Sequence, residues 1–439
     1  MLVSIKHISN FSMFEKEKKY FPKITDPQCQ LKWNWSTLWL NEGRSASCHR
    51  CLHLPLDLEN FDNFHNHPHK VKEREIMLSG KWPTVENGGS GHCMHCKKVE
   101  DGGGVSDRVN MLKMPNQSPP EMEDNPEATF VTPRVLEIFM NDTCNMKCTY
   151  CGPDDSSQWK SEIKKHGAVT DPDGNPIPYL EKKYEGMSKH KHQGLFLEKT
   201  KDWLLRNAYK LSRLHLLGGE TFYQSELDEI LDTLENVKAR DLELNIVSNL
   251  MVKEGRFRSV IERIKKLVKD RKIGRFDLTA SIDGWGPEAE YARTGLKCDH
   301  FEKLFSYAVD QKWMTLHCNL TVTAMTVRAT PQLVTKVLEY RNKNPKISIR
   351  SNALTGSPFL HPSAFGRNFW KDDLKNILSV WPKENQHDIN QMEEIKGQFL
   401  SIKNEMPEKT LVRYFKHYLD QLDKRRNTNW REVFPYLDI

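Results

Sequence analysis

The stretch TCNMKCTYCG, residues 143–152, contains Cys144, Cys148 and Cys151, separated by three residues and then by two. Three thiolates on one short loop can hold three irons of a four-iron, four-sulfur cluster. The fourth iron then has no protein ligand and can bind a small molecule. A zinc site takes four ligands in a tetrahedral array, and no fourth ligand stands at zinc-like spacing here. The stretch therefore predicts a catalytic metal centre.

The three cysteines, with Tyr150 directly before the last of them, resemble the signature of the radical S-adenosylmethionine (SAM) superfamily. In that family the signature lies on the loop after the first barrel strand. The resemblance implies a [4Fe-4S] cluster on Cys144, Cys148 and Cys151, with SAM bound to the free iron. It further implies that one electron, from a donor such as flavodoxin or ferredoxin, cleaves SAM to methionine and a 5'-deoxyadenosyl radical. That radical abstracts hydrogen from an unreactive carbon.

Further residues of the expected SAM site follow in order along the chain. Gly218, Gly219 and Glu220, in LHLLGGETF, match the Gly-Gly-Glu motif of the family. Glycines let backbone carbonyls approach the SAM ammonium without a side chain in the way, and Glu220 adds negative charge nearby. Arg293, in YARTG, resembles a family arginine that could pair with a carboxylate of SAM or substrate. The remaining cofactor-binding candidates are Tyr150, Ser248, Asn249, Ser281 and Asp283, of which the last four could instead cap helices.

From about residue 133, short apolar segments alternate with amphipathic ones. The pattern predicts strands at 134–140, 211–218, 242–249, 275–283, 315–323 and 347–353, with helices between them. Successive βα units favour an α/β fold with a parallel sheet, here a partial (β/α)6 radical SAM barrel. In such folds the chemistry collects at the carboxyl ends of the strands. The cysteine loop, the Gly-Gly-Glu motif and the Ser-x-Asp sequence all fall there.

Four segments are expected. Residues 1–115 form a small Cys-rich domain, 116–132 a proline-rich linker, 133–354 the partial barrel, and 355–439 a helical extension that packs against the open side of the barrel. A polar insert after Cys151, ending near residue 194, is either a substrate-facing flap or a surface excursion. The HNHPH run at 65–69 is expected to be a solvated turn, and Cys318 a core residue. Cys298 is expected in a loop.

The Cys-rich segment supplies a second set of metal-ligand candidates, Cys29, Cys48, Cys51, Cys93 and Cys96. The spacing from Cys29 through Gly43 to Cys48 resembles the opening of SPASM or twitch domains, which carry auxiliary iron–sulfur clusters in peptide-modifying radical SAM enzymes. Those domains usually follow the barrel, whereas this segment precedes it. The expected ligands are Cys29, Cys93 and Cys96 with either Cys48 or Cys51. The rival is a structural zinc on Cys48, Cys51, Cys93 and Cys96.

Composition limits the class of protein. The net charge is +6, the mean hydropathy is −0.68, and no apolar run reaches membrane-spanning length. The first twenty residues lack a signal-peptide pattern, so we expect a cytoplasmic protein without membrane contact. Lys and Arg are interleaved with Asp and Glu, so a nucleic-acid partner is not expected. The leading hypothesis is a radical SAM enzyme that modifies a peptide or protein. The alternatives are modification of RNA or a nucleotide-like small molecule, and a non-catalytic zinc-binding protein.

Overall fold

The computed structural model describes residues 27–102, 106–112, 118–177, 190–354, 357–366, 368–400 and 406–439. The expectation for the first twenty residues lies outside this range. Within the described residues, nine strands form one sheet in the order β11-β10-β8-β7-β6-β4-β1-β2-β3. A separate two-stranded sheet pairs β5 with β9.

The strands of the large sheet fall into two groups along the chain. The Cys-rich segment contributes β1 (Trp35–Trp39), β2 (Arg44–Ala46) and β3 (Leu54–Pro55). The barrel segment contributes β4 (Val135–Phe139), β6 (Arg213–Leu217), β7 (Ala239–Ser248), β8 (Ile273–Ser281), β10 (Thr315–Val322) and β11 (Ile347–Ala353). The small sheet consists of β5 (Lys147–Cys148) and β9 (Arg293–Thr294).

The helices follow the same division. The Cys-rich segment and the residues after it contain α2 (Gln30–Asn34), α3 (Pro68–Leu78), α4 (Met94–Asp101), α5 (Asp107–Leu112) and α6 (Glu121–Asp124). The barrel segment contains α7 (Ser157–His166), α9 (Gln193–Asn207), α10 (Ser225–Glu235), α11 (Glu254–Lys269), α12 (Pro287–Ala292), α13 (Cys298–Asp310) and α14 (Thr330–Lys343). The carboxyl-terminal part contains α15 (Lys371–Val380), α16 (Gln386–Leu400), α17 (Glu408–Arg426) and α18 (Trp430–Val433).

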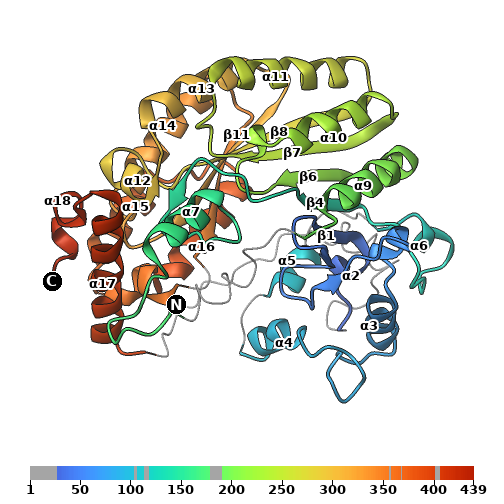
Figure 1. The fold of residues 1–439 in the computed structure, drawn as a ribbon, viewed down its shortest axis with the longest axis horizontal. Coiled ribbons are helices and arrows are strands. Elements are labelled where there is room, and N and C mark those ends of the chain that lie inside the picture. Colours follow the sequence, from blue (N-terminus) through green and yellow to red (C-terminus); the bar gives the residue numbers. More distant parts are fainter. Residues whose placement is uncertain are drawn as a thin grey trace, which may run out of the picture.

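The barrel strands are parallel, and neighbours in the sheet follow one another along the chain. Each strand lies where the alternating apolar pattern predicts it, so the expected α/β architecture of successive βα units is confirmed. Figure 1 shows helices α9, α10, α11, α13 and α14 ranged along one side of this sheet. Their buried residues, such as Phe257, Ile261 and Ile264 of α11, recur at helical spacing and meet the apolar side of the strands.

The two faces of the sheet differ in chemistry. On β10, Leu316, Cys318 and Leu320 are buried among apolar side chains, which confirms Cys318 as a core residue. Side chains alternate between the faces of a strand, so Thr315, His317, Asn319 and Thr321 share the other face. The strand register places Glu137, His215, Asn245 and Asp277 in one row on that same face. Strands of parallel sheets are usually apolar on both faces. We call this side of the sheet the polar face.

The Cys-rich segment extends the barrel sheet. Strand β1 runs parallel to β4, with Trp35 opposite Val135 and Trp39 opposite Phe139, and β2 then pairs antiparallel with β1. Part of the segment expected to be a linker is also packed, because Met122 of α6 is buried with Trp33. The domain boundaries themselves stay a prediction.

One expectation for the Cys-rich segment is wrong. His65, the first residue of the HNHPH run, is buried rather than solvated, with 1% of its surface exposed. Its Nδ1 lies 2.7 Å from Ser36 Oγ, and its Nε2 lies 2.9 Å from the carbonyl oxygen of Trp33. Arg74 also contacts His65 Nε2, at 3.0 Å. The sequence pattern failed here because these partners lie outside the run.

Helix α17 belongs to the carboxyl-terminal part of the chain (Figure 1) and packs against the cysteine loop and α7. The Tyr418 hydroxyl donates to the carbonyl oxygen of Thr149 at 2.6 Å. Arg426 forms two hydrogen bonds of 3.1 Å to the carboxylate of Glu162 in α7, and both side chains are almost fully buried. Among the described helices, none is long and apolar enough to cross a membrane.

The contact of α17 with α7 predicts that replacing two different arginines of α17 changes the stability of the protein by different amounts. Arg426→Met leaves the buried carboxylate of Glu162 with Lys147 as its remaining cation, so the free energy of unfolding should fall by about 3 kcal/mol. Arg413→Met removes an exposed pair with Asp173 and should cost less than about 1 kcal/mol. Urea denaturation followed by circular dichroism measures both. Equal losses would contradict the bracing role of Arg426.

Candidate functional site

A cavity of about 430 Å³ lies at the carboxyl ends of the parallel strands. All three cysteines of the 143–152 loop line it. The structure brings the following predicted site residues to the same cavity: Cys144, Cys148, Tyr150, Cys151, Gly218, Gly219, Ser248, Asn249, Ser281 and Arg293. The volume is in the range of a pocket for a cofactor-sized molecule. These residues come from four strand ends that are far apart in the sequence.

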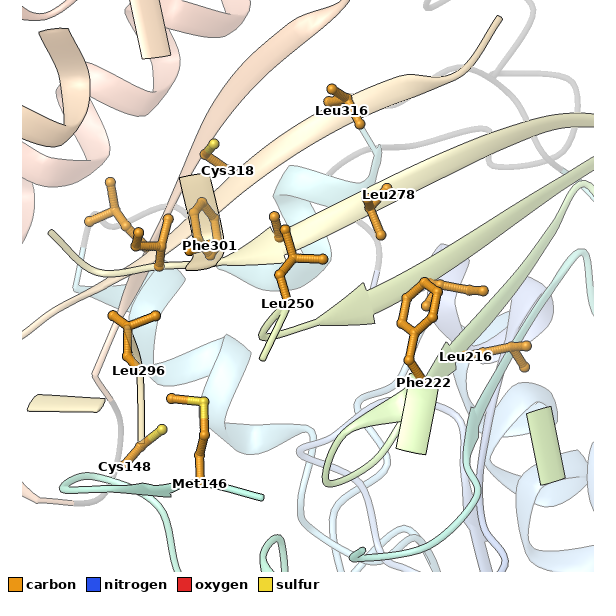
Figure 2. Packing of buried hydrophobic residues seen from close by; sticks show 14 of the residues in the cluster. Met146, Cys148, Leu216, Phe222, Leu250, Leu278, Leu296, Phe301, Leu316 and Cys318 are labelled. Atoms are coloured by element: carbon orange, nitrogen blue, oxygen red, sulfur yellow. The ribbon is translucent and has the colours of Figure 1, made fainter. Parts of the chain in front are cut away.

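The cysteine loop is held by its neighbours on both sides. Strand β5 pairs antiparallel with β9, which places Cys148 opposite Arg293. Ser156 caps α7, and its hydroxyl also donates to the carbonyl oxygen of Met146 at 2.7 Å. Trp159, fully buried in α7, donates from its indole nitrogen to the carbonyl oxygen of Cys148 at 2.8 Å. Figure 2 shows Met146 and Cys148 at one end of the apolar cluster, near Leu296.

Helix α7 belongs to the polar insert that follows Cys151. This part of the insert supports the cysteine loop. Residues 178–189 of the insert lie outside the described residues.

The Gly-Gly-Glu turn fits tightly against the start of the cysteine loop. The amide of Gly219 donates to the carbonyl oxygen of Asn141 at 2.9 Å, and the amide of Glu220 donates to that of Thr143 at 2.8 Å. A Cβ at Gly219 would lie 2.5 Å from the Thr143 oxygen, and one at Gly218 would lie 2.4 Å from the Asn141 oxygen. Gly218 also has a φ of +151°, a conformation that favours glycine. The two glycines therefore let β6 and the loop approach each other closely.

Glu220 links two strand ends and does not line the cavity. Its carboxylate accepts hydrogen bonds from the Ser248 hydroxyl and the Asn249 amide, both at 2.7 Å. Burial raises the pKa of Glu220, and those hydrogen bonds oppose the rise. Asn249 in turn donates from its side chain to Asn145 Oδ1 at 3.0 Å and approaches Cys144 Sγ at 4.0 Å. Glu220 thus positions the end of β7 against the cysteine loop.

Tyr150, Asp283 and Arg293 form a hydrogen-bonded group, in which Tyr150 and Arg293 line the cavity and Asp283 lies behind them. The Tyr150 hydroxyl donates to Asp283 Oδ2 at 2.5 Å, and Arg293 Nη1 lies 2.5 Å from the same hydroxyl. Asp283 also accepts from the amide of Thr321 at 2.9 Å. Burial raises the pKa of Tyr150 well above its usual value, which keeps the phenol neutral. Asp283 is fully buried and does not line the cavity, so it holds Tyr150 and Arg293 in place.

The donor set of this cavity fits a four-iron cluster with one open iron. Three thiols line the cavity, and within the described residues no fourth cysteine joins them. Burial raises the pKa of Cys144 to about 12 and also raises that of Cys148. Metal binding therefore has to displace protons from these thiols. The rest of the wall carries amide, hydroxyl and guanidinium groups that can bind a polar cofactor.

Sequence reasoning missed several residues that line the cavity. Asn319 and Thr321, on the polar face of β10, reach it beside Ser281. The other lining residues that were missed are Met146, Asp155, Val247 and Leu354. A polar residue at the carboxyl end of a predicted strand was the signal used for Ser281. The same signal was present in the NLTVT sequence of β10. Asp155 and Leu354 lie in loops, where no periodic pattern marks them.

The five cysteines of the amino-terminal segment line a second cavity, of about 450 Å³. Cys48 Sγ and Cys51 Sγ lie 3.1 Å apart. Hydrogen bonds from Cys48 and Cys93 hold the pKa of Cys51 below its usual value. Burial raises the pKa of Cys29 to about 12. The structure therefore brings together the thiols of both expected ligand sets, and Cys48, Cys51 and Cys93 form the tightest part of the group.

A buried cation accompanies these thiols. Lys32 lines the cavity and pairs with the buried carboxylate of Glu73. Ser90 also donates to Glu73, from its amide at 3.0 Å and from its hydroxyl at 2.7 Å. The positive charge of Lys32 would offset the negative charge of bound thiolates. Across the described ranges, no three or more His, Cys, Asp or Glu side chains are arranged around a single metal-ion position.

Comparison with known proteins gives distant structural likenesses. No protein-family model and no curated protein matches the chain. The chain is similar to a solved structure of native anSMEcpe with bound AdoMet and a Kp18Cys peptide, at 17% identity and a TM-score of 0.34, over 56% of this chain and 59% of that one. It is also similar to a structure of TYW1 with a lysine–pyruvate adduct bound, at 14% identity and a TM-score of 0.29, over 56% of this chain and 72% of that one. The match thus spans less than two thirds of the anSMEcpe chain.

Because the end of β6 lies close to the cysteine loop, adding one methyl group at Gly219 should destabilise the protein. Gly219→Ala forces the backbone of Asp142 and Thr143 to shift, so the free energy of unfolding should fall by roughly 1–3 kcal/mol. Gly255→Ala is the matched control, because a Cβ there meets no atom within 4 Å. In helix α11 that change should raise stability by about 0.5 kcal/mol. Urea titrations of both variants measure the difference, and a neutral Gly219→Ala would disprove the tight fit.

Proposed function

We propose that the protein is a radical SAM enzyme whose [4Fe-4S] cluster is held by Cys144, Cys148 and Cys151. One observation carries the proposal: these thiols share a cavity with a glycine turn and with polar side chains from the carboxyl ends of several parallel strands. Three thiols leave one iron open to a ligand in the same cavity. When bound and reduced, the cluster supplies the electron that cleaves SAM to methionine and a 5'-deoxyadenosyl radical.

The residues of the chain bind and orient SAM in this proposal. Arg293 lines the cavity, and its buried Nε has no hydrogen-bond partner among the described residues, so it can donate to a carboxylate. The Asn249 side chain and the Ser281 hydroxyl are candidates for the polar groups of the ribose and methionine parts. Asn319 and Thr321 add two further polar side chains to the same wall. Glu220 and Asp283 keep this wall in place from below.

We further propose a peptide or protein as the substrate and a second metal centre in the amino-terminal cavity. Support for both comes from the resemblance of the Cys-rich segment to auxiliary-cluster domains and from the five thiols that share one cavity. The strand pairing of β1 with β4 joins that cavity to the barrel sheet. An auxiliary iron–sulfur cluster is proposed over structural zinc. A flavodoxin or ferredoxin is the proposed electron donor.

SAM cleavage tests the three-cysteine site. Reconstituted protein with dithionite should convert SAM to 5'-deoxyadenosine, and Cys148→Ala should reduce the rate to background because an iron ligand is lost. Anaerobic incubation followed by liquid chromatography measures the product. Cys318→Ala is the control, since that thiol lies in the apolar core, away from both cavities. Turnover by Cys148→Ala at the control rate would refute the assignment.

Metal analysis separates the proposals for the amino-terminal cavity. A two-cluster protein should contain about eight irons, whereas a zinc-supported enzyme should contain about four irons and one zinc. Cys93→Ala and Cys96→Ala should lower the iron content by about four and leave SAM cleavage partly active. Iron and zinc are measured by mass spectrometry on anaerobic protein. Full iron content in both variants would exclude an auxiliary cluster there, and zinc without iron in the wild type would exclude the enzyme.

A further inference from the structure

A third cavity, of about 610 Å³, opens at the other end of strands β10 and β11. It is lined from the polar face by Thr315, His317, Ser348 and Arg350. Asn319 and Thr321, the next residues on the same face of β10, line the candidate SAM cavity. The two cavities thus lie along one strand face. Arg350 lies opposite Asn319 in the strand register, and from Asn319 to Thr321 the strand rises by about 7 Å.

Arg350 has no carboxylate partner within the described residues. It is half-buried, and the one hydrogen-bond contact of its guanidinium in that part of the chain is to His317 Nε2, at 2.9 Å. The same imidazole nitrogen lies 3.3 Å from Asp277 Oδ2. A guanidinium can only donate and a carboxylate can only accept. One imidazole nitrogen cannot satisfy both at once.

The conflict has a simple resolution. His317 Nδ1 lies 2.6 Å from the Ser348 hydroxyl, which can donate or accept. If His317 Nε2 donates to Asp277, the buried carboxylate is satisfied and Arg350 needs another acceptor. An external anion in the adjoining cavity would supply that acceptor. Binding of that anion would then give Arg350 the acceptor that it lacks while His317 Nε2 donates to Asp277.

The other two long cationic side chains of this cavity, Arg341 and Lys346, differ from Arg350. Arg341 makes two hydrogen bonds to the buried carboxylate of Asp388, at 2.8 and 3.0 Å. Lys346 donates to the carbonyl oxygen of Lys312 at 3.0 Å, and its side chain is exposed to solvent. Arg350 is therefore the half-buried guanidinium of this cavity without a carboxylate partner among the described residues. A nucleic-acid backbone would need a row of such cations. One guanidinium fits one carboxylate, which it can bind through two parallel hydrogen bonds.

We propose that Arg350 binds a carboxylate of the substrate, at a subsite beside the candidate SAM cavity on the polar face. The inference rests on the proposed function and specifies its substrate class as a peptide with an acidic side chain. An extended peptide covers the rise from Asn319 to Thr321 in about two residues. The polar face of β10 and β11 would then contact the peptide between the acidic residue and the reacting residue.

Chemical labelling tests the state of Arg350 directly. Phenylglyoxal reacts with accessible guanidinium groups, and mass spectrometry of digested holoenzyme locates the modified residues. Arg350 should be labelled in the free protein and protected several-fold by a blocked pentapeptide with a central glutamate. The matched pentapeptide with glutamine should protect it less. Arg341, already paired with Asp388, is the internal control and should respond to neither peptide. Equal protection by the two peptides would overturn the proposal.

Binding measurements on variants complete the test. Calorimetry should show the glutamate peptide binding at least about tenfold more tightly than the glutamine peptide, as expected for a charge-assisted pair. Arg350→Gln should remove that preference, while Lys346→Gln, which changes a cation in the same cavity, should keep it. A preference that survives Arg350→Gln would refute the subsite. Stronger protection of Arg350 by an RNA oligonucleotide would replace the carboxylate with a phosphate.

The two levels of inference remain separable. Labelling and calorimetry do not depend on SAM cleavage. An acid preference without 5'-deoxyadenosine formation would count against the radical SAM assignment and keep the carboxylate subsite. SAM cleavage without a preference for the glutamate peptide would support the radical SAM assignment and count against the carboxylate subsite.

Discussion

Two backbone hydrogen bonds, from Gly219 and Glu220 to the carbonyl oxygens of Asn141 and Thr143, fix the cysteine loop against the end of β6. The rest of the site depends on them. Glu220 accepts hydrogen bonds from Ser248 and Asn249 at the end of β7. The same turn therefore positions the ends of β6 and β7 and the loop that contains Cys144. The glycines of this turn are needed for close packing, because a side chain at either position would overlap the backbone of the loop.

The sheet has one apolar face and one polar face. Its apolar side is covered by helices, which stabilise the fold. Its polar face carries ionisable groups that lie within ion-pair distance of one another across strands, including Glu137 with His215 and Asp277 with His317. Such groups are costly to bury without partners. A sheet with this face is suited to hold a polar ligand along its strands, and both the candidate SAM cavity and the Arg350 cavity lie on it.

Much of the barrel could be predicted from the sequence, because alternation of apolar residues reports local periodicity. The six parallel strands and the cysteine loop at their carboxyl ends follow from that pattern. What the pattern could not give was long-range pairing. Nothing local indicates that Trp35–Trp39 joins β4, that His65 lies under Arg74, or that Asp283 supports Tyr150. These contacts join residues far apart in the chain, and single-sequence periodicity carries no information about them.

Helix α17 contacts the cysteine loop through Tyr418 and the neighbouring helix α7 through Arg426, although more than 250 residues separate the partners in the chain. During synthesis the cysteines leave the ribosome long before this helix exists. Domains fold as their residues emerge, from the amino terminus onward. The loop therefore gains its contact with Tyr418 only after α17 has been made. If the three thiols take up a metal cluster before that point, the cluster enters a loop that α17 does not yet hold.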